Sequence, residues 1–268
     1  MDRIINLDSI LNIRDLGGLE TTSNLHVKPK KILRSGNLSE ATDSDIKYLM
    51  DNYKLETIID LRNEMECLEA PDNTLNGMVK HLNFPILSSK QMGVSHEEEI
   101  DRADSLYYFV NYNVKNNCGK QFMTDLYLQF INSEHSREYY RKVFKTLLQE
   151  QEGSYLIHCT VGKDRAGTSI LFLLKVLGVK DEDILEDYLL TNIYVEEDIQ
   201  NKVKLLSSRI DSPILESTYR ALFGADRAYI EALAKEIIKK YQTFDKFALE
   251  FLDLSKQDQD LLRSIYLE

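Results

Sequence analysis

Apolar residues along the chain form short runs rich in β-branched and aromatic residues, and longer stretches with helical spacing. The short runs predict four strands, at residues 31–35, 55–61, 78–86 and 154–158. The longer stretches predict helices, among them 38–53, 122–130, 136–149, 168–177, 180–194, 195–208, 226–241, 243–252 and 255–266. Together these elements predict an α/β fold with a central, mostly parallel β-sheet flanked by helices and extended by C-terminal helices.

The predicted fold is organised around residues 153–174, which read GSYLIHCTVGKDRAGTSILFLL. A buried strand ends at His158, a short loop follows, and an apolar helix continues until Gly178. Cys159 therefore lies at the tip of a strand, in a loop that leads into a helix N-terminus. Backbone N–H groups and the helix dipole stabilise an anion at such a junction, and they favour the thiolate form of a cysteine. Arg165 follows in the same loop, and its planar guanidinium can hold two phosphate oxygens at once.

His158 and Cys159, followed after five residues by Arg165, resemble the active-site loop of the cysteine-dependent protein tyrosine phosphatase superfamily. The longer sequence HCTVGKDRAG is similar to the loop His-Cys-x-x-Gly-Lys-Asp-Arg-x-Gly of its bacterial tyrosine phosphatase family. The resemblance implies a tyrosine phosphatase-like fold in which Cys159 is the nucleophile, Arg165 the phosphate clamp and His158 an orienting group. It also implies that the other loop residues bind the substrate phosphate: Thr160, Val161, Gly162, Lys163, Asp164 and Ala166. The structural alternative is a buried cysteine beside a solvated cluster of charged residues.

A second segment near the N-terminus resembles the same family. Residues 12–19 read NIRDLGGL, and on their own the two glycines predict only a turn between short β-prone pieces. The resemblance implies that Arg14 and Asp15 are structural ion-pair partners that brace the floor of the active site.

Asp60 lies near the carboxyl end of the second predicted strand and Arg62 directly after it, and functional groups gather at such strand ends in open α/β sheets. A surface ion pair is the alternative interpretation. A phosphatase needs a general acid to protonate the leaving oxygen, and most tyrosine phosphatases carry it on a mobile Trp-Pro-Asp loop, but this chain has no Trp. The resemblance to the bacterial family implies Asp60 for this role, and Asp164 is the alternative. Glu64 and Glu66 are expected to be ordinary solvated residues at the start of a helix.

Residues 88–132 are expected to form a helical insert. The segment begins with many charged residues, and aromatic residues recur at helical spacing between 100 and 112. We expect a lid over the active site that shields the thiolate and opens for substrate; a core helix next to a loop is the alternative. Because no repeat or low-complexity linker divides the chain, we expect residues 1–268 to form one phosphatase domain that contains this insert.

Composition limits the partners and the compartment. The net charge of −11 argues against nonspecific nucleic-acid binding, which uses a basic surface. The 3 Cys are scattered and the 5 His show no paired spacing, so we expect no disulfide framework, metal or cofactor. No apolar run approaches the roughly 18 residues of a membrane span, and the charged N-terminus does not resemble a signal peptide. We therefore expect a cytoplasmic monomer, and leaderless export remains open.

The predicted reaction is phosphomonoester hydrolysis through a cysteinyl-phosphate intermediate without a metal. The expected substrate is a phosphotyrosine protein, with dual specificity or a phosphoinositide as alternatives. Lys163 adds a cation that suits a more highly charged substrate, unless it only pairs with Asp164 or a neighbouring acid. Ala166 stands where the superfamily usually has Ser or Thr, so we expect slower hydrolysis of the intermediate. A phosphate-binding module without turnover and a thiol-based arsenate reductase or sulfurtransferase are the other functions left open.

Overall fold

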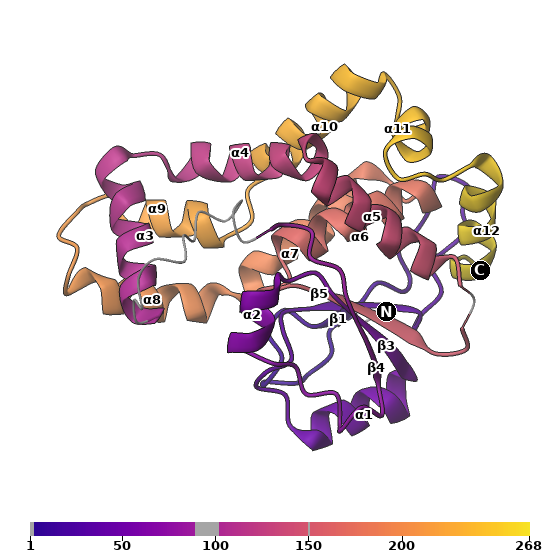
Figure 1. Cartoon of the computed structure of the whole chain (residues 1–268), viewed down its shortest axis with the longest axis horizontal. Coiled ribbons are helices and arrows are strands. Elements are labelled where there is room, and N and C mark those ends of the chain that lie inside the picture. The colour runs from indigo at the N-terminus through magenta and orange to yellow at the C-terminus, as the bar shows by residue number, and fades with distance from the viewer. Residues whose placement is uncertain (1–2, 89–101, 150) are drawn as a thin grey trace.

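Five strands form one sheet in the order β1-β2-β5-β3-β4 in the computed structural model, which describes residues 3–88, 102–149 and 151–268 (Figure 1). The strands are β1 (Arg14–Asp15), β2 (Ile32–Ser35), β3 (Leu55–Asp60), β4 (Lys80–Asn83) and β5 (Ser154–His158). β1 runs antiparallel to β2, and the other neighbouring pairs are parallel. The predicted α/β fold with a mostly parallel sheet is therefore confirmed, although β4 is shorter than the strand predicted at 78–86.

The parallel register brings the carboxyl ends of four strands to the same edge of the sheet. His158 at the end of β5 lies opposite Ser35 at the end of β2 and opposite Asp60 at the end of β3. Asn83 at the end of β4 lies opposite Asp60 on the other side. Ligands bind just outside the carboxyl ends of strands in such sheets, so the segments that follow these strands can build a site.

Alternate side chains of the central strands enter two hydrophobic cores on opposite faces of the sheet. Ile58 and Leu156 belong to the smaller core, which α1 (Asp43–Tyr53) covers from below in Figure 1. Ile59 and Ile157 belong to the larger core on the opposite face. Because burial of one such side chain contributes roughly 1.5–3 kcal/mol, the two cores fix the sheet between its helical layers.

The larger core is centred on α6 (Asp164–Leu177), the apolar helix predicted after the cysteine loop. It ends where Gly178 adopts a left-handed conformation with φ of 85°. Helices α7 (Asp181–Tyr194) and α12 (Lys256–Tyr266) contact it directly. α5 (Glu134–Leu147) packs on it through Tyr140, whose ring lies 5.2 Å from that of Phe172. The cysteine loop therefore leads into the most enclosed helix of the fold.

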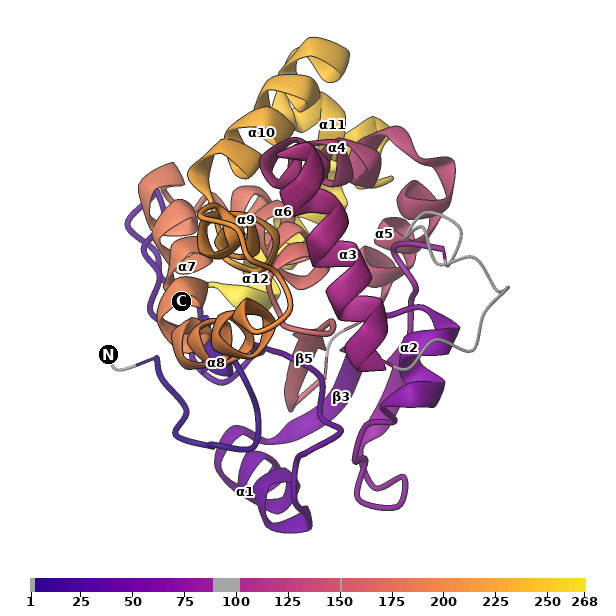
Figure 2. The ribbon, with the colours of Figure 1, turned by 90° about the vertical axis from the view of Figure 1, so that its left-hand side faces the viewer.

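The expected insert at 88–132 falls partly on residues 89–101, outside the described residues. Its described part forms α3 (Arg102–Asn116) and α4 (Gly119–Asn132). Both helices contact α9 (Leu215–Phe223), and α4 also contacts α10 (Arg227–Tyr241), as Figure 2 shows. The lid function of this insert stays a prediction.

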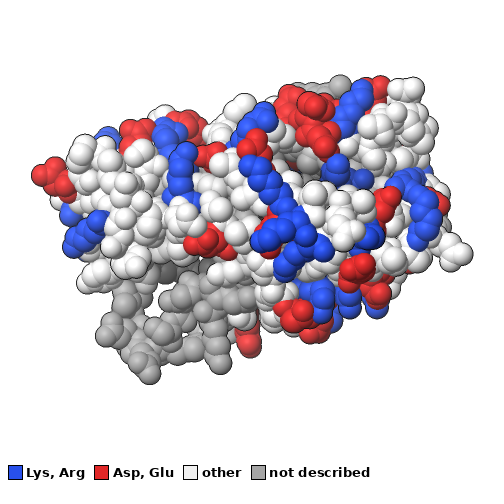
Figure 3. Space-filling view, turned by 90° about the horizontal axis from the view of Figure 1, so that it is seen from above, with Lys and Arg blue, Asp and Glu red and all other residues white. Residues whose placement is uncertain are grey.

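The remaining helices are α2 (Glu64–Glu69), α8 (Glu196–Ser207) and α11 (Phe244–Glu250). Among the helices of the described residues, α9 alone lies in a stretch for which no element was predicted, and it is one of the shorter ones. Seen from above in Figure 3, acidic and basic side chains are interspersed, so this face does not present the continuous basic surface that nonspecific nucleic-acid binding uses. Among the described residues, no helix combines the length and apolar character needed to cross a membrane.

Candidate active site

The loop between β5 and α6 is held from behind through its carbonyl oxygens. Three successive carbonyls accept hydrogen bonds from side chains outside the loop: Asn37 to Thr160 (3.0 Å), Asn12 to Val161 (3.1 Å) and Arg34 to Gly162 (2.6 Å). Because the carbonyls are occupied on the outside, the backbone N–H groups remain for the concave side of the loop. Together with the N-terminus of α6 they form a cradle that suits an anion.

Gly162 allows this loop to pass close to the end of β2. Its φ is 73°, in the left-handed region. A Cβ at this position would lie 2.3 Å from the carbonyl oxygen of Ser35. The turn therefore requires glycine both for its backbone conformation and for the close approach of the two segments.

Cys159 and Arg165 lie at the two ends of this cradle and are 2% and 6% exposed. Burial by itself would lower the pKa of Arg165, but the hydrogen bonds and charge of Glu66, followed by the charge of Cys159, raise that pKa above its usual value. Burial lowers the pKa of Lys163, and the charges that oppose this effect are those of Asp164 first and Cys159 last. Both cations thus lie near enough to stabilise a thiolate electrostatically.

Glu66 holds the guanidinium of Arg165 in a two-point ion pair, and the expectation that it is an ordinary solvated residue is wrong. Nη1 of Arg165 lies 2.6 Å from Oε2 of Glu66, and Nη2 lies 2.7 Å from Oε1. The Thr160 hydroxyl donates to Oε1 at 2.5 Å and accepts from Nη2 at 2.9 Å. The bonds to Glu66 and to Thr160 engage both terminal nitrogens, so a phosphate has to share this guanidinium with its protein partners.

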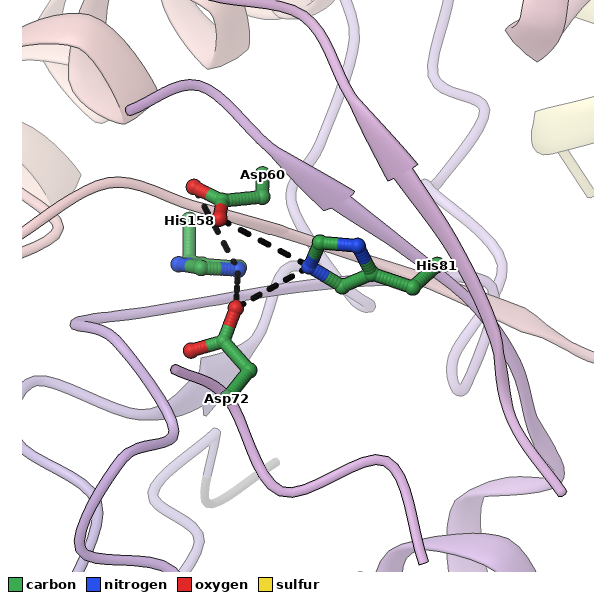
Figure 4. A group of neighbouring side chains, drawn as sticks. All are labelled: Asp60, Asp72, His81 and His158. Carbon is green, nitrogen blue, oxygen red and sulfur yellow. Dashed lines mark hydrogen bonds and ion pairs between the residues drawn. The ribbon is translucent and has the colours of Figure 1, made fainter. Parts of the chain in front are cut away.

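Asp60 lies at the end of β3, fully buried, in the group of side chains drawn in Figure 4. Both of its oxygens are bound by Arg62, with Nε at 2.9 Å from Oδ1 and Nη2 at 2.8 Å from Oδ2. Arg62 also binds Asp72 at 2.8 Å, and His158 lies 3.1 Å from the same Asp72 oxygen. His81 completes the group at 3.1 Å from Asp72 and 3.6 Å from Asp60. The network therefore ties the residue before the nucleophile to the end of β3 and, through His81, to β4.

The charges of this network shift the pKa of its members in opposite directions. Burial would raise the pKa of Asp60, but His158, His81 and Arg62 outweigh it and hold that pKa well below its usual range. The contacts of His81 with the carboxylates of Asp60 and then Asp72 raise the pKa of His81 to about 9. His81 therefore carries a positive charge at neutral pH while both carboxylates stay ionised.

Four possible metal-ligand atoms of this network, from Asp60, Asp72, His81 and His158, lie within 4.8 Å of one another. However, Nη2 of Arg62 already lies between Oδ2 of Asp60 and Oδ2 of Asp72, at 2.8 Å from each. A divalent cation would have to displace this guanidinium and the proton of His81. The geometry fits an ion-pair network better than a metal centre.

Arg14 reaches the loop through α7 and not through Asp15. It binds Asp187 at 2.9 Å, and Arg34 binds the other oxygen of Asp187 at 2.6 Å while also donating to the Gly162 carbonyl. Asp15 instead accepts from the backbone N–H groups of residues 17 and 30. Arg14 thus supports the loop indirectly, and Asp15 stabilises the turn that follows β1.

The Lys163 side chain reaches the C-terminal end of α9. Its fully buried ammonium group donates to the carbonyls of Leu222 at 2.7 Å and Gly224 at 3.0 Å, where α9 ends. It also lies 3.4 Å from Oδ1 of Asp164. The ammonium therefore lies among protein acceptors, and the substrate contact expected for Lys163 stays a prediction.

Ala166 and the hydroxyl residues after it occupy the first turns of α6. Ala166 is fully buried. The Thr168 hydroxyl donates to the Asp164 carbonyl at 2.8 Å, and the Ser169 hydroxyl donates to the Arg165 carbonyl at 2.9 Å. Both hydroxyls are thus engaged within the helix and do not replace the one that Ala166 lacks.

Several proteins resemble this chain in sequence. A "Putative tyrosine-protein phosphatase" of Cupriavidus necator is 27% identical over 271 residues, which cover 97% of this chain and 87% of that protein. A tyrosine-protein phosphatase of Nostoc commune is 28% identical over 165 residues, or 61% of this chain and 49% of that protein. The triple specificity protein phosphatase PtpB of Mycobacterium tuberculosis is 24% identical over 212 residues, or 76% of this chain and 74% of that protein.

Among solved structures, the core catalytic domain of the PP-IP phosphatase SIW14 from S. cerevisiae, in complex with citrate, aligns with 79% of this chain and 88% of its own. The TM-score is 0.32 and the sequence identity 15%, which is too distant to bear on function. The sequence model of the tyrosine phosphatase family, in contrast, matches residues 5–268. Since this match spans nearly the whole chain, the protein belongs to the tyrosine phosphatase family.

Proposed function

We propose that the protein hydrolyses phosphomonoesters through a cysteinyl-phosphate intermediate formed on Cys159. The observation that carries this proposal is the orientation of the loop, whose carbonyls are bonded from behind so that its N–H groups remain for a phosphate. The buried guanidinium of Arg165 supplies a planar clamp at the end of the same loop. Membership of the tyrosine phosphatase family supports this chemistry.

In the first step the Cys159 thiolate attacks phosphorus, so that an S–P bond forms while the P–O bond to the leaving group breaks. Arg165 and the loop N–H groups stabilise the negative charge on the phosphoryl oxygens of the transition state. The electron pair of the broken bond remains on the leaving oxygen, which takes a proton from a general acid.

Asp164 suits the general acid better than Asp60. Asp60 is fully buried, its two oxygens are held by Arg62, and its pKa lies well below the usual range, so it has no proton to donate near neutral pH. The Asp164 side chain belongs to the loop itself and is 23% exposed. We therefore assign proton donation to Asp164, and we assign to Asp60 and Arg62 the support of His158, the residue before the nucleophile.

In the second step water attacks phosphorus, the S–P bond breaks and its electron pair returns to sulfur. The Asp164 carboxylate accepts the proton that water loses. A hydroxyl near the departing sulfur would stabilise the thiolate, but Ala166 supplies none. Release of phosphate from the intermediate is therefore expected to be the slow step.

Phosphotyrosine in proteins is the substrate that we propose first, because the family and two of the named relatives are tyrosine phosphatases. Phosphoserine or phosphothreonine and phosphoinositides are the further candidates, and one relative is named for triple specificity. Lys163→Ala compared on a phosphotyrosine peptide and a phosphoinositide separates the two functions of this lysine. Equal losses of activity on both substrates indicate that Lys163 only stabilises the loop against α9. A larger loss on the phosphoinositide indicates that Lys163 contacts the substrate.

A panel of phosphopeptides and phosphoinositides assayed in EDTA with a thiol reductant tests the proposal. We expect phosphate release from the wild-type protein, loss of turnover with retained binding for Cys159→Ser, and little change for Cys118→Ser, a matched substitution between α3 and α4. A wild-type protein that binds phosphopeptides without releasing phosphate would instead be a binding module. Turnover of arsenate or of a sulfur donor alone would favour the thiol-based alternatives.

A further inference from the structure

Tyr127 on α4 donates a hydrogen bond to the carboxylate that we assign as the proton donor. Its hydroxyl lies 2.8 Å from Oδ1 of Asp164, although the two residues are 37 positions apart in the sequence. Tyr127 is fully buried, whereas the Asp164 side chain is 23% exposed. The contact therefore reaches from the interior of the helical layer to the edge of the cysteine loop.

The hydroxyls around Tyr127 give this hydrogen bond a fixed direction. The Tyr188 hydroxyl lies 2.7 Å from that of Tyr127. Since Tyr127 has one hydroxyl proton and donates it to Asp164, Tyr188 is the donor in the pair. Burial raises the pKa of Tyr127 well above its usual value. Tyr127 therefore remains a donor over the whole pH range in which a phosphatase would work.

Aromatic packing fixes the ring that carries this hydroxyl. The ring of Tyr127 lies 5.4 Å from that of Phe130, 5.5 Å from that of Tyr229 and 6.3 Å from that of Tyr188. A ring enclosed on several sides has little freedom, so the hydroxyl position is set by the core and not by the loop.

Lys163 also lies near this oxygen of Asp164, but its contact is longer than that of Tyr127. Its ammonium lies 3.4 Å from Oδ1 of Asp164 but 2.7 Å and 3.0 Å from two carbonyls at the end of α9. The shorter contact of Tyr127 is therefore the one that orients the carboxylate.

Resting on the proposed function, we propose that Tyr127 is the positioning residue of the proton donor. Its hydroxyl holds Oδ1 of Asp164 towards the core, and Oδ2 carries the proton that passes to the leaving oxygen. Tyr127 touches neither substrate nor phosphorus, so it acts only through Asp164. Because Tyr127 belongs to α4, part of the helical insert takes part in setting the chemistry of the loop.

Aryl phosphates with different leaving groups test this proposal, because a proton donor matters most when the leaving phenol is weakly acidic. We expect Tyr127→Phe to lower kcat/KM for phenyl phosphate by about ten- to hundredfold and for dinitrophenyl phosphate by much less. kcat/KM is the appropriate quantity because it reports formation of the cysteinyl phosphate and not its hydrolysis. Asp164→Asn should show the same dependence on the leaving group, with larger losses.

Two controls separate positioning from general damage. Tyr229→Phe also removes a buried hydroxyl next to the same rings, but that hydroxyl donates to the Ala221 carbonyl. Any decrease in kcat/KM in this variant should therefore be equal for all leaving groups. Tyr127→Phe placed in the Asp164→Asn background should cause little further loss, because the group that it orients is already absent.

A Tyr127→Phe effect that is the same for every leaving group, or that adds fully to Asp164→Asn, would overturn the positioning role while leaving the proposed function intact. Absence of Cys159-dependent turnover in the wild-type protein would overturn both. A thermal unfolding measurement on each variant shows which share of a uniform loss comes from destabilisation of the fold.

Discussion

Arg165 and Glu66 form a two-point ion pair that joins the segment after β5 to the segment after β3, with nitrogen–oxygen distances of 2.6 and 2.7 Å. Glu66 is placed for this contact by α2, where it also caps the helix by accepting the N–H of Asn63 at 3.0 Å. The guanidinium is thus oriented before any phosphate arrives. Such preorganisation reduces the reorganisation that the transition state would otherwise require.

Glu66→Gln should weaken catalysis by releasing the clamp. The amide keeps one acceptor but loses the charge and one of the two contacts, so we expect kcat/KM on a phosphotyrosine peptide to fall roughly ten- to hundredfold. Steady-state kinetics measure the effect, and Glu64→Gln on the exposed side of the same helix is the matched control. Unchanged or higher activity would mean that Glu66 competes with phosphate for Arg165 and does not prepare it.

The local part of this site could be predicted from the sequence, because strand, loop and helix are continuous in the chain. Cys159 and Arg165 belong to one short stretch whose apolar pattern, glycine and charges all indicate the same geometry. Glu66 could not be predicted in this way, since its contact depends on how α2 docks against a loop 99 residues away. The capping box at the start of α2 is a local signal that predicts only the helix.

The same limit explains the positions of Lys163 and Asp60. Lys163 belongs to the loop motif, but its direction is set by the end of α9, a helix that the sequence did not predict. Asp60 ends a strand as expected, but Asp72 lies outside any helix or strand and His81 lies within β4, and no local signal indicates that the two meet Asp60. Position along the chain was therefore predictable, whereas the partners of these charges follow from tertiary packing.

Ala166→Thr should shorten the life of the cysteinyl phosphate. The added hydroxyl can donate to the departing sulfur. One such hydrogen bond should make hydrolysis of the cysteinyl phosphate about two- to tenfold faster. Burst-phase kinetics with para-nitrophenyl phosphate measure the decay of the intermediate. Ala166→Val has the same shape without the hydroxyl and controls for crowding at this fully buried position. Equal decay rates in the wild-type protein and the Thr variant would exclude this explanation of slow turnover.

His81 should make the stability of the fold depend on pH. Its folded-state pKa is raised to about 9 from the ordinary value of 6.5, so its ion pairs contribute fully below about pH 6.5 and are lost as the pH rises through about 9. We expect Tm to fall by a few degrees over this interval, and to fall less in His81→Gln. Thermal unfolding followed by circular dichroism measures this, with the exposed His26→Gln as the control. If Tm falls by the same amount over this pH interval in His81→Gln and in the wild-type protein, the stability of the network does not depend on this proton.

Gly162→Ala should abolish the phosphate cradle while most of the fold persists. The new Cβ would meet the Ser35 carbonyl oxygen at 2.3 Å, so the loop must move away from β2. Displacement of a cradle by about 1 Å costs on the order of a hundredfold in rate, and we expect at least this loss in kcat/KM.

Gly77→Ala is the matched control, because Gly77 has a similar φ of 81° but no neighbouring atom within 4 Å of a Cβ. It should lower stability by about 1 kcal/mol and leave kcat/KM unchanged. Equal effects of the two substitutions on kcat/KM would show that backbone strain, and not the contact with β2, determines the shape of the loop.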